Sequence, residues 1–170
     1  MSLRPLSAFI LSAFFLPLAN AASPPLAVWT GDAAKDTLGK SVAFAGDVNG
    51  DGYGDYVIGI PGFDVPAAAG TGRVMNAGRA LVISGADGSV LISAANKHPR
   101  LMGSAVAGGG DVDNDGFNDV VVGNSSGVTI LYGPDGQRTR DINCVDSFGS
   151  SIALADINHD GYADIVVGAP

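Results

Sequence analysis

The stretch Gly46-Asp-Val-Asn-Gly-Asp-Gly-Tyr-Gly-Asp55 sets three carboxylates and one amide at alternating positions between two apolar runs. The same pattern, D-[VI]-[ND]-x-D-G-[FY]-x-D, occurs three times, over residues 47–55, 111–119 and 156–164. The copies start 64 and then 45 residues apart, which is typical of repeat architectures whose units are single supersecondary blocks. The sequence therefore predicts a repeat fold organised around these three loops.

The residues around each loop repeat as well and predict β-strands. A Gly-containing run of small and apolar residues precedes each loop, and YVIGI, VVVGN or IVVGA follows it. In the first two units, two further β-rich runs flank a GADG or GPDG turn. Four short strands in a unit of this length indicate a propeller blade. We therefore expect an all-β chain: a β-propeller segment of about two and a half four-stranded antiparallel blades, which makes an incomplete propeller.

The loops have the composition of a calcium site. Calcium takes about six to eight oxygen ligands, and side chains at loop positions 1, 3 and 5 can wrap one ion. Glycine at position 6 permits the sharp bend and turns the next carbonyl towards the ion, while aspartate at position 9 closes the loop. We expect up to three Ca²⁺ ions. The expected ligands, with the position-7 residues acting through their carbonyls, are Asp47, Asn49, Asp51, Tyr53 and Asp55; Asp111, Asp113, Asp115, Phe117 and Asp119; and Asp156, Asn158, Asp160, Tyr162 and Asp164.

Three other interpretations of the loops are weaker. An EF-hand requires a bidentate Glu at position 12, where this chain has Ile58, Val122 and Val167 inside predicted strands. Bare polar turns would gather several carboxylates without a counter-charge, which costs free energy. Magnesium prefers a smaller octahedral shell that keeps several waters.

The motifs flanking the third loop are Phe148-Gly149 before it and Gly168-Ala-Pro170 after it. With these motifs the chain resembles the FG-GAP repeats of integrin α-subunit β-propellers and of related secreted bacterial FG-GAP/VCBS-like proteins. The first two repeats depart from the flanking motifs. They have Leu38-Gly39 with Gly59-Ile-Pro61, and Met102-Gly103 with Gly123-Asn-Ser125.

The resemblance implies a calcium-stabilised propeller with its ions on one face and its ligands or partner subunits on the opposite face. We accordingly divide the chain into an N-terminal lead-in, residues 22–37, and three repeats, residues 38–100, 101–147 and a truncated 148–170. Further repeats or another chain are expected to complete the propeller, either because this is the N-terminal part of a longer or interrupted reading frame or because the chain assembles with copies or with a partner.

The first 21 residues read as a secretory signal peptide. Arg4 precedes a short apolar run, and the small residues Ala19 and Ala21 suit signal peptidase. The run is too short to cross a bilayer, so no transmembrane span is expected after cleavage. Loss of Arg4 changes the net charge from −8 to −9, which disfavours nucleic acid as a partner. We therefore expect a secreted protein, extracellular or periplasmic.

The first repeat contains an insertion, residues 61–77, between its second and third strands. Long loops in a tight repeat often carry binding, although neutral length variation explains the insertion equally well. On the resemblance, this loop would lie away from the calcium ions, so a protein or extracellular partner of unknown identity is first sought there.

We expect a non-enzymatic module for cell adhesion or protein recognition. The alternatives are a scaffold or accessory propeller of a secreted hydrolase whose catalytic part is not in this chain, and a purely structural envelope protein. Residues 123–127 match the G-x-S-x-G nucleophile elbow, but a predicted strand follows where that motif needs a helix. His98 and His159 are expected to be solvated. The lone cysteine, Cys144, is expected to be buried beside Ile142 and Val145, and the alternative is a free thiol that pairs with another molecule.

Overall fold

The computed structural model describes residues 28–31, 33, 35–67, 72–144 and 148–170. The predicted signal peptide lies outside the described residues. All the regular structure in this part of the chain is β-strand, which confirms the expected fold class. No helix in the described segments has the length and apolar character required to cross a membrane.

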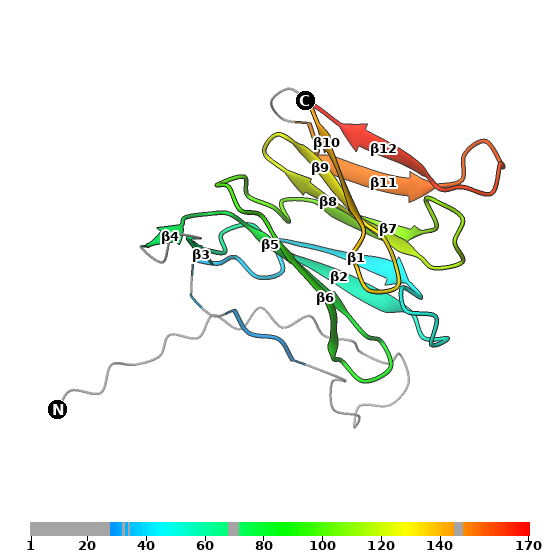
Figure 1. The fold of residues 1–170 in the computed structure, drawn as a ribbon, viewed down its shortest axis with the longest axis horizontal. Helices are drawn as coiled ribbons and strands as arrows, with labels where there is room; N and C mark the ends of the chain where they lie inside the picture. The colour runs from blue at the N-terminus through cyan, green and yellow to red at the C-terminus, as the bar shows by residue number, and fades with distance from the viewer. Residues whose placement is uncertain (1–27, 32, 34, 68–71, 145–147) are drawn as a thin grey trace, which may run out of the picture.

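Two four-stranded antiparallel sheets and a two-stranded third sheet form the body of the protein (Figure 1). The first sheet has the spatial order β1-β2-β5-β6, the second β7-β8-β9-β10, and the third pairs β11 with β12. The strands of these sheets are β1 (Ser41–Gly46), β2 (Asp55–Ile60), β5 (Arg79–Ile83), β6 (Val90–Ala95), β7 (Val106–Gly110), β8 (Asp119–Asn124), β9 (Gly127–Leu131), β10 (Thr139–Asn143), β11 (Ser151–Ala155) and β12 (Asp164–Gly168). The four-stranded meanders are consistent with propeller blades, and the third sheet is a partial blade.

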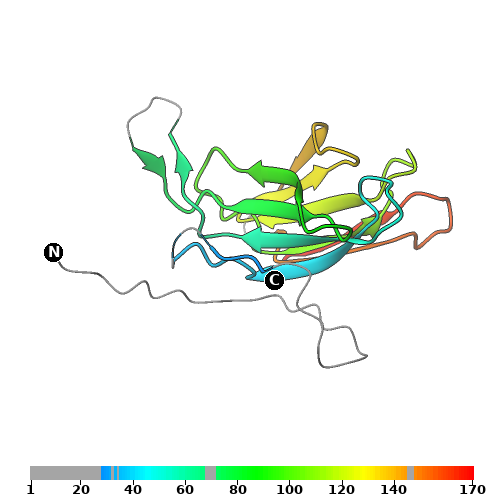
Figure 2. The same ribbon diagram turned by 90° about the horizontal axis from the view of Figure 1, so that it is seen from below.

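The blades pack face to face through apolar clusters, with their first strands β1, β7 and β11 adjacent (Figures 1 and 2). Val57, Val82 and Val120 belong to the cluster between the first two blades. Val121, Val128 and Ile130 begin the next cluster, which Ile152 and Val167 of the third sheet cover. Alternate residues of one strand thus serve opposite faces, as the period of 2 predicts.

Each repeat places one residue of its first flanking motif in an apolar cluster. Met102 packs in the cluster between the first and second blades, and Phe148 in the cluster between the second and third. Leu38, in the same motif position, joins Trp29 and Phe63 on the outer face of the first blade. The departures from Phe at this position therefore keep its apolar packing role.

The glycines of the two flanking motifs are fixed by close backbone approach. The N–H of Gly103 donates to the carbonyl of Gly123 in the same repeat, at 2.9 Å. A Cβ on Gly59 would lie 2.1 Å from the Gly103 carbonyl oxygen of the next repeat, and one on Gly123 would lie 2.2 Å from that of Gly149. Only glycine allows the backbones of successive blades to approach this closely.

The first two blades contain a β-bulge that the third lacks. The register shifts between Phe44 and Gly46 in β1 and between Gly108 and Gly110 in β7. β11 pairs with β12 without a shift, because this repeat has one residue fewer between its Phe-Gly motif and the first loop aspartate. The extra residue in the first two repeats is the one that bulges.

The inserted segment forms a hairpin rather than an open loop. β3 (Val65–Pro66) pairs with β4 (Arg73–Val74), with Val65 opposite Val74. Residues 68–71, between the two strands, lie outside the described residues. The hairpin projects from the end of the blades opposite the three aspartate loops (Figures 1 and 2). This is the position expected from the resemblance.

Two smaller expectations have different outcomes. Residues 123–127 contain the end of β8, a two-residue turn and the start of the antiparallel strand β9, so they do not have the strand-turn-helix geometry of a nucleophile elbow. The prediction of a buried Cys144 is wrong, because its side chain is exposed. It follows the last residue of β10, the outer strand of its sheet, where no further strand of the described chain covers it.

Candidate metal centre

The three aspartate loops join β1 to β2, β7 to β8 and β11 to β12, at one end of the blades (Figure 1). Their glycines at position 6 have the expected left-handed backbone, with φ of 85° at Gly52, 95° at Gly116 and 90° at Gly161. Position 4 is also left-handed in every loop. Its residues are Gly50 (φ 76°), Asn114 (φ 58°) and His159 (φ 61°). All three loops therefore have the same bend. At position 4 the sequence has Gly, Asn or His, which are residue types that tolerate a left-handed backbone.

The aspartate at position 1 organises each loop by accepting hydrogen bonds from backbone N–H groups. The Asp47 carboxylate accepts from Gly50 at 2.8 Å, Asp51 at 3.0 Å and Gly52 at 2.8 Å. Asp111 and Asp156 accept the corresponding bonds from the residues at positions 5 and 6. These hydrogen bonds alone wrap the loop backbone around the position-1 carboxylate.

The side chains at positions 3 and 5 lie beside each other in the first and third loops. The Asn49 amide nitrogen donates to Asp51 at 2.9 Å, and Asn158 donates to Asp160 at the same distance. The position-5 carboxylate also accepts the N–H of the position-7 residue, at 2.8 Å in Tyr53 and 2.9 Å in Tyr162. The carbonyls of the position-7 residues remain predicted ligands.

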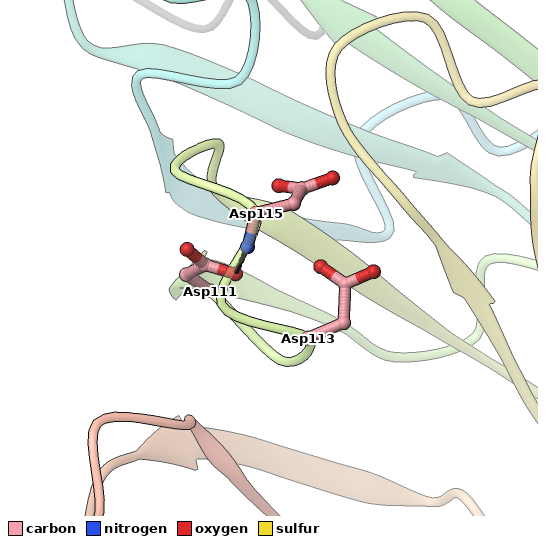
Figure 3. A group of neighbouring side chains, drawn as sticks. All are labelled: Asp111, Asp113 and Asp115. Atoms are coloured by element: carbon pink, nitrogen blue, oxygen red, sulfur yellow. Dashed lines mark hydrogen bonds between the residues drawn. The ribbon is translucent and has the colours of Figure 1, made fainter.

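The second loop brings three carboxylates together. One oxygen each of Asp111, Asp113 and Asp115 lies within 4.8 Å of the others, and Figure 3 shows the three side chains on this loop. The Asp113 Oδ1 atom is buried and has no hydrogen-bond partner. A buried acceptor without a donor is costly, and a hard cation that prefers carboxylate oxygens satisfies it. The residues of this loop therefore fit a metal such as calcium.

The position-9 aspartates have a structural role that the sequence did not reveal. Asp55 and Asp119 are completely buried. The Asp119 carboxylate accepts the N–H of Val112 in its own loop at 2.7 Å and that of Gly133 in the β9–β10 turn at 2.9 Å. Asp119 lies outside the group of three carboxylates, and its role as a metal ligand remains a prediction. Asp164 accepts the bond within its loop, from Ile157 at 3.0 Å.

The Asp119 carboxyl also shows the electrostatic character of this loop. Burial raises the pKa of Asp119 above its usual value, and the hydrogen bonds from Gly133 and Val112 oppose that shift. The charges of Asp111 and Asp115 raise the pKa further. The loop is therefore a place where added negative charge is unfavourable and a cation is favoured.

One residue at this centre has no counterpart in the sequence prediction. Arg138 lies in the turn before β10, and its guanidinium forms an ion pair with Oδ2 of Asp113. The two residues are 25 positions apart, and no motif links them. His98 and His159, as expected, are exposed.

Comparison with known proteins agrees with this architecture. The FG-GAP repeat matches residues 38–75, 102–137 and 148–170, more than half of the chain. The chain is 34% identical over 162 residues to human integrin alpha-IIb, covering 82% of this chain and 15% of that protein. It is 32% identical over 166 residues to chicken integrin alpha-V, covering 83% and 16% respectively. It is also 32% identical over 124 residues to bovine phosphatidylinositol-glycan-specific phospholipase D, covering 73% and 10%.

The chain thus spans only a small part of these relatives, and what it shares with them is the repeat itself. The three matched segments each contain one of the aspartate loops and both of its flanking motifs or their variants. The chain therefore belongs to the FG-GAP repeat family and is distantly related to the N-terminal propeller repeats of integrin α-subunits.

Proposed function

We propose that this chain is an exported, calcium-binding FG-GAP module that serves cell adhesion or protein recognition and catalyses no reaction. The observation that carries the proposal is the Asp111, Asp113 and Asp115 triad, with its buried and unpartnered Asp113 oxygen. The other two loops have the same backbone bend and the same position-1 hydrogen bonds. We therefore extend the proposal to three calcium ions, one in each loop.

In each loop, the side chains at positions 1, 3 and 5 and the carbonyl at position 7 would hold the ion. Calcium supplies two positive charges where the loop concentrates carboxylates. The position-1 aspartate keeps the backbone wrapped. In the first and third loops the position-3 amide now donates to the position-5 carboxylate, so it would have to present its oxygen to the ion instead. In the first two blades the position-9 aspartate connects the loop to the turn between the third and fourth strands. Asp55 accepts the N–H of Gly85, and Asp119 accepts the N–H of Gly133. Calcium would therefore stiffen whole blades rather than isolated loops.

We place partner binding at the β3–β4 hairpin, opposite the aspartate loops. The hairpin is anchored at its base. The Asp64 carboxylate accepts the N–H of Asn76 at 2.9 Å, and the Arg73 guanidinium donates to the Asp64 carbonyl at 2.7 Å. Lys35 of the lead-in forms an ion pair with Asp64 at 3.0 Å. These contacts fix the base of the hairpin, so a partner that contacts the described strands β3 and β4 would lose little conformational entropy there on binding.

The test of the metal is a calorimetric titration of calcium into chelator-treated protein. Saturable binding with a stoichiometry of up to three is expected. The triple variant Asp51→Ala, Asp115→Ala and Asp160→Ala should lose most of it. A matched variant, Asp87→Ala, Asp135→Ala and Asp141→Ala, removes the same charge from positions outside the loops and should bind like the wild type. Equal losses in both variants would show that total charge, not the loops, attracts calcium.

The test of the partner is capture on the immobilised chain with calcium present. Replacing residues 65–74 by a short Gly-Ser linker should abolish capture of a partner protein and leave calcium binding unchanged. Capture that survives this replacement would assign recognition to another surface.

The similarity to phosphatidylinositol-glycan-specific phospholipase D favours a second candidate. In this alternative the repeats are the accessory propeller of a secreted hydrolase. The coding sequence that follows Pro170 distinguishes the two candidates. Further repeats favour the adhesion module, and a catalytic motif favours the hydrolase.

A further inference from the structure

We propose that Arg138 sets the calcium affinity of the second loop by competing with the ion for the Asp113 carboxylate. The inference rests on the proposed calcium binding and adds a residue outside the loop to it. It distinguishes the second loop from the other two, which have no such cation among the contacts of their described residues.

Two contacts hold the Arg138 side chain over the loop. Its guanidinium pairs with Asp113 Oδ2, and its Cζ lies 4.0 Å from the centroid of the Tyr132 ring. Tyr132 is buried, and its backbone N–H donates to the Arg138 carbonyl at 3.1 Å. The stacking and the backbone bond thus position a positive charge at the rim of the carboxylate group.

Comparison of the repeats within the chain ties Arg138 to Asp113. Position 3 is Asn49 in the first loop and Asn158 in the third, so only the second loop has a carboxylate there. Alignment of the GADG and GPDG turns places Val90 of the first blade at the position of Arg138, and Ser84 at that of Tyr132. The repeat with the extra negative charge is therefore the one with the extra cation and the ring that supports it.

The two oxygens of Asp113 are in different situations. Oδ2 is paired with Arg138, whereas Oδ1 is buried without a hydrogen-bond partner. The second loop has four carboxylates and each of the other loops has three, because only the second has Asp at position 3. In the ion-free protein the Arg138 guanidinium balances the charge of this additional carboxylate. When calcium binds, the guanidinium repels the ion or has to leave Asp113, and either event weakens binding. The Arg138 side chain is 59% exposed, so solvent screens this repulsion and keeps the effect moderate.

The experiment uses the full chain with Asp51→Ala and Asp160→Ala, in which the second loop is the remaining intact loop. Calcium alone is titrated calorimetrically at low and at high salt. Arg138→Gln should tighten binding about three- to tenfold at low salt, and the gain should shrink at high salt, as expected for a screened charge. Arg138→Lys, which keeps the charge, should bind within about twofold of the background. Unchanged or weaker binding in Arg138→Gln would overturn the inference.

Two controls separate competition from other effects. Arg140→Gln removes the same charge from an exposed residue of β10 and should change the affinity far less than Arg138→Gln. With Asp113→Asn added, Arg138→Gln should have little effect, because the carboxylate for which the two cations compete is gone. An equal gain from Arg140→Gln, or a full gain with Asp113→Asn present, would contradict competition.

The failure of this inference can be distinguished from failure of the proposed function. If the wild-type chain binds no calcium, both are wrong. If the wild type binds calcium and Arg138→Gln brings no gain, only the role of Arg138 is wrong.

Discussion

The carboxylate of Asp55 accepts a hydrogen bond from the backbone N–H of Gly85, 3.0 Å away and 30 positions further along the chain. Its other oxygen accepts the N–H of Val48 within the aspartate loop, at 2.8 Å. Asp119 and Gly133 repeat this relationship in the second blade. The last aspartate of the motif thus ties the loop between the first two strands to the turn between the last two.

This tie predicts a large loss of stability on replacing Asp55. Asp55→Ala leaves two N–H groups without their charged acceptor, one of them buried, and should cost about 2–5 kcal/mol in free energy of unfolding. The measurement is urea unfolding in the presence of a chelator.

Asp51 provides the control, because its carboxylate accepts its bonds at the exposed surface of the same loop. Asp51→Ala should cost about 1 kcal/mol or less in chelator. Equal losses for the two variants would contradict the buried tie.

Close approach of successive blades predicts that Gly59 cannot be replaced. The Cβ of Gly59→Ala would lie 2.1 Å from the Gly103 carbonyl oxygen and 2.3 Å from the Ser41 hydroxyl oxygen. The blades would have to separate, so we expect a loss of about 3 kcal/mol or more, measured by urea unfolding.

Gly52→Ala is the matched control for this substitution. Gly52 has a positive φ of 85°, but no atom beyond Gly52 and its two chain neighbours lies within 4 Å of the point where a Cβ would stand, so its replacement meets backbone strain alone. This should cost about 1–2 kcal/mol. A larger loss at Gly52 than at Gly59 would show that turn strain outweighs blade contact.

The base of the inserted hairpin should respond to acid. The N–H of Asn76 and then Lys35 hold the pKa of Asp64 below its usual value. A lowered folded-state pKa means that the Asp64 carboxylate stabilises the fold above its unfolded pKa of about 3.9. This stability is lost as the pH falls through the lower, folded pKa.

The wild type should therefore be more stable than Asp64→Asn at neutral pH, and the difference should shrink below about pH 4. Denaturation midpoints measured for both proteins across this range give the comparison. A difference that stays constant with pH would assign the effect to packing rather than to charge.

Calcium should raise the melting temperature of the wild type. An ion that binds only the folded state adds about 2.7 kcal/mol per site at a free concentration 100 times its dissociation constant. The triple variant Asp51→Ala, Asp115→Ala and Asp160→Ala should show little of this shift. A wild-type midpoint that is the same in calcium and in chelator would contradict the metal proposal.

Much of the fold followed from local pattern. Alternation of apolar residues predicted the strands, and the identical spacing of three aspartate loops predicted the repeat. The local pattern did not predict the short β3–β4 pairing or the exposure of Cys144, because both depend on the tertiary contacts of these segments. The residues 61–77 are rich in Gly, Pro and Ala, and such composition indicates a loop.

At the site, the sequence predicted the composition of the loops and the left-handed glycine at position 6. It could not reveal that Gly85 and Gly133 are partners of the position-9 aspartates, since neither lies in the motif. Nor could it reveal Arg138, whose pairing with Asp113 depends on the β9–β10 turn folding back over the β7–β8 loop.

By itself, the sequence determined the class of the fold, the number of aspartate loops and the oxygen donors in each, because spacing and residue type are local properties. Only the tertiary structure decided how these parts are joined. Gly59 and Gly103 approach each other across two blades, and the buried Asp55 and Asp119 accept hydrogen bonds from distant turns. Arg138 forms an ion pair with Asp113. Each of these contacts links residues far apart in the chain, and packing of the blades brings them together.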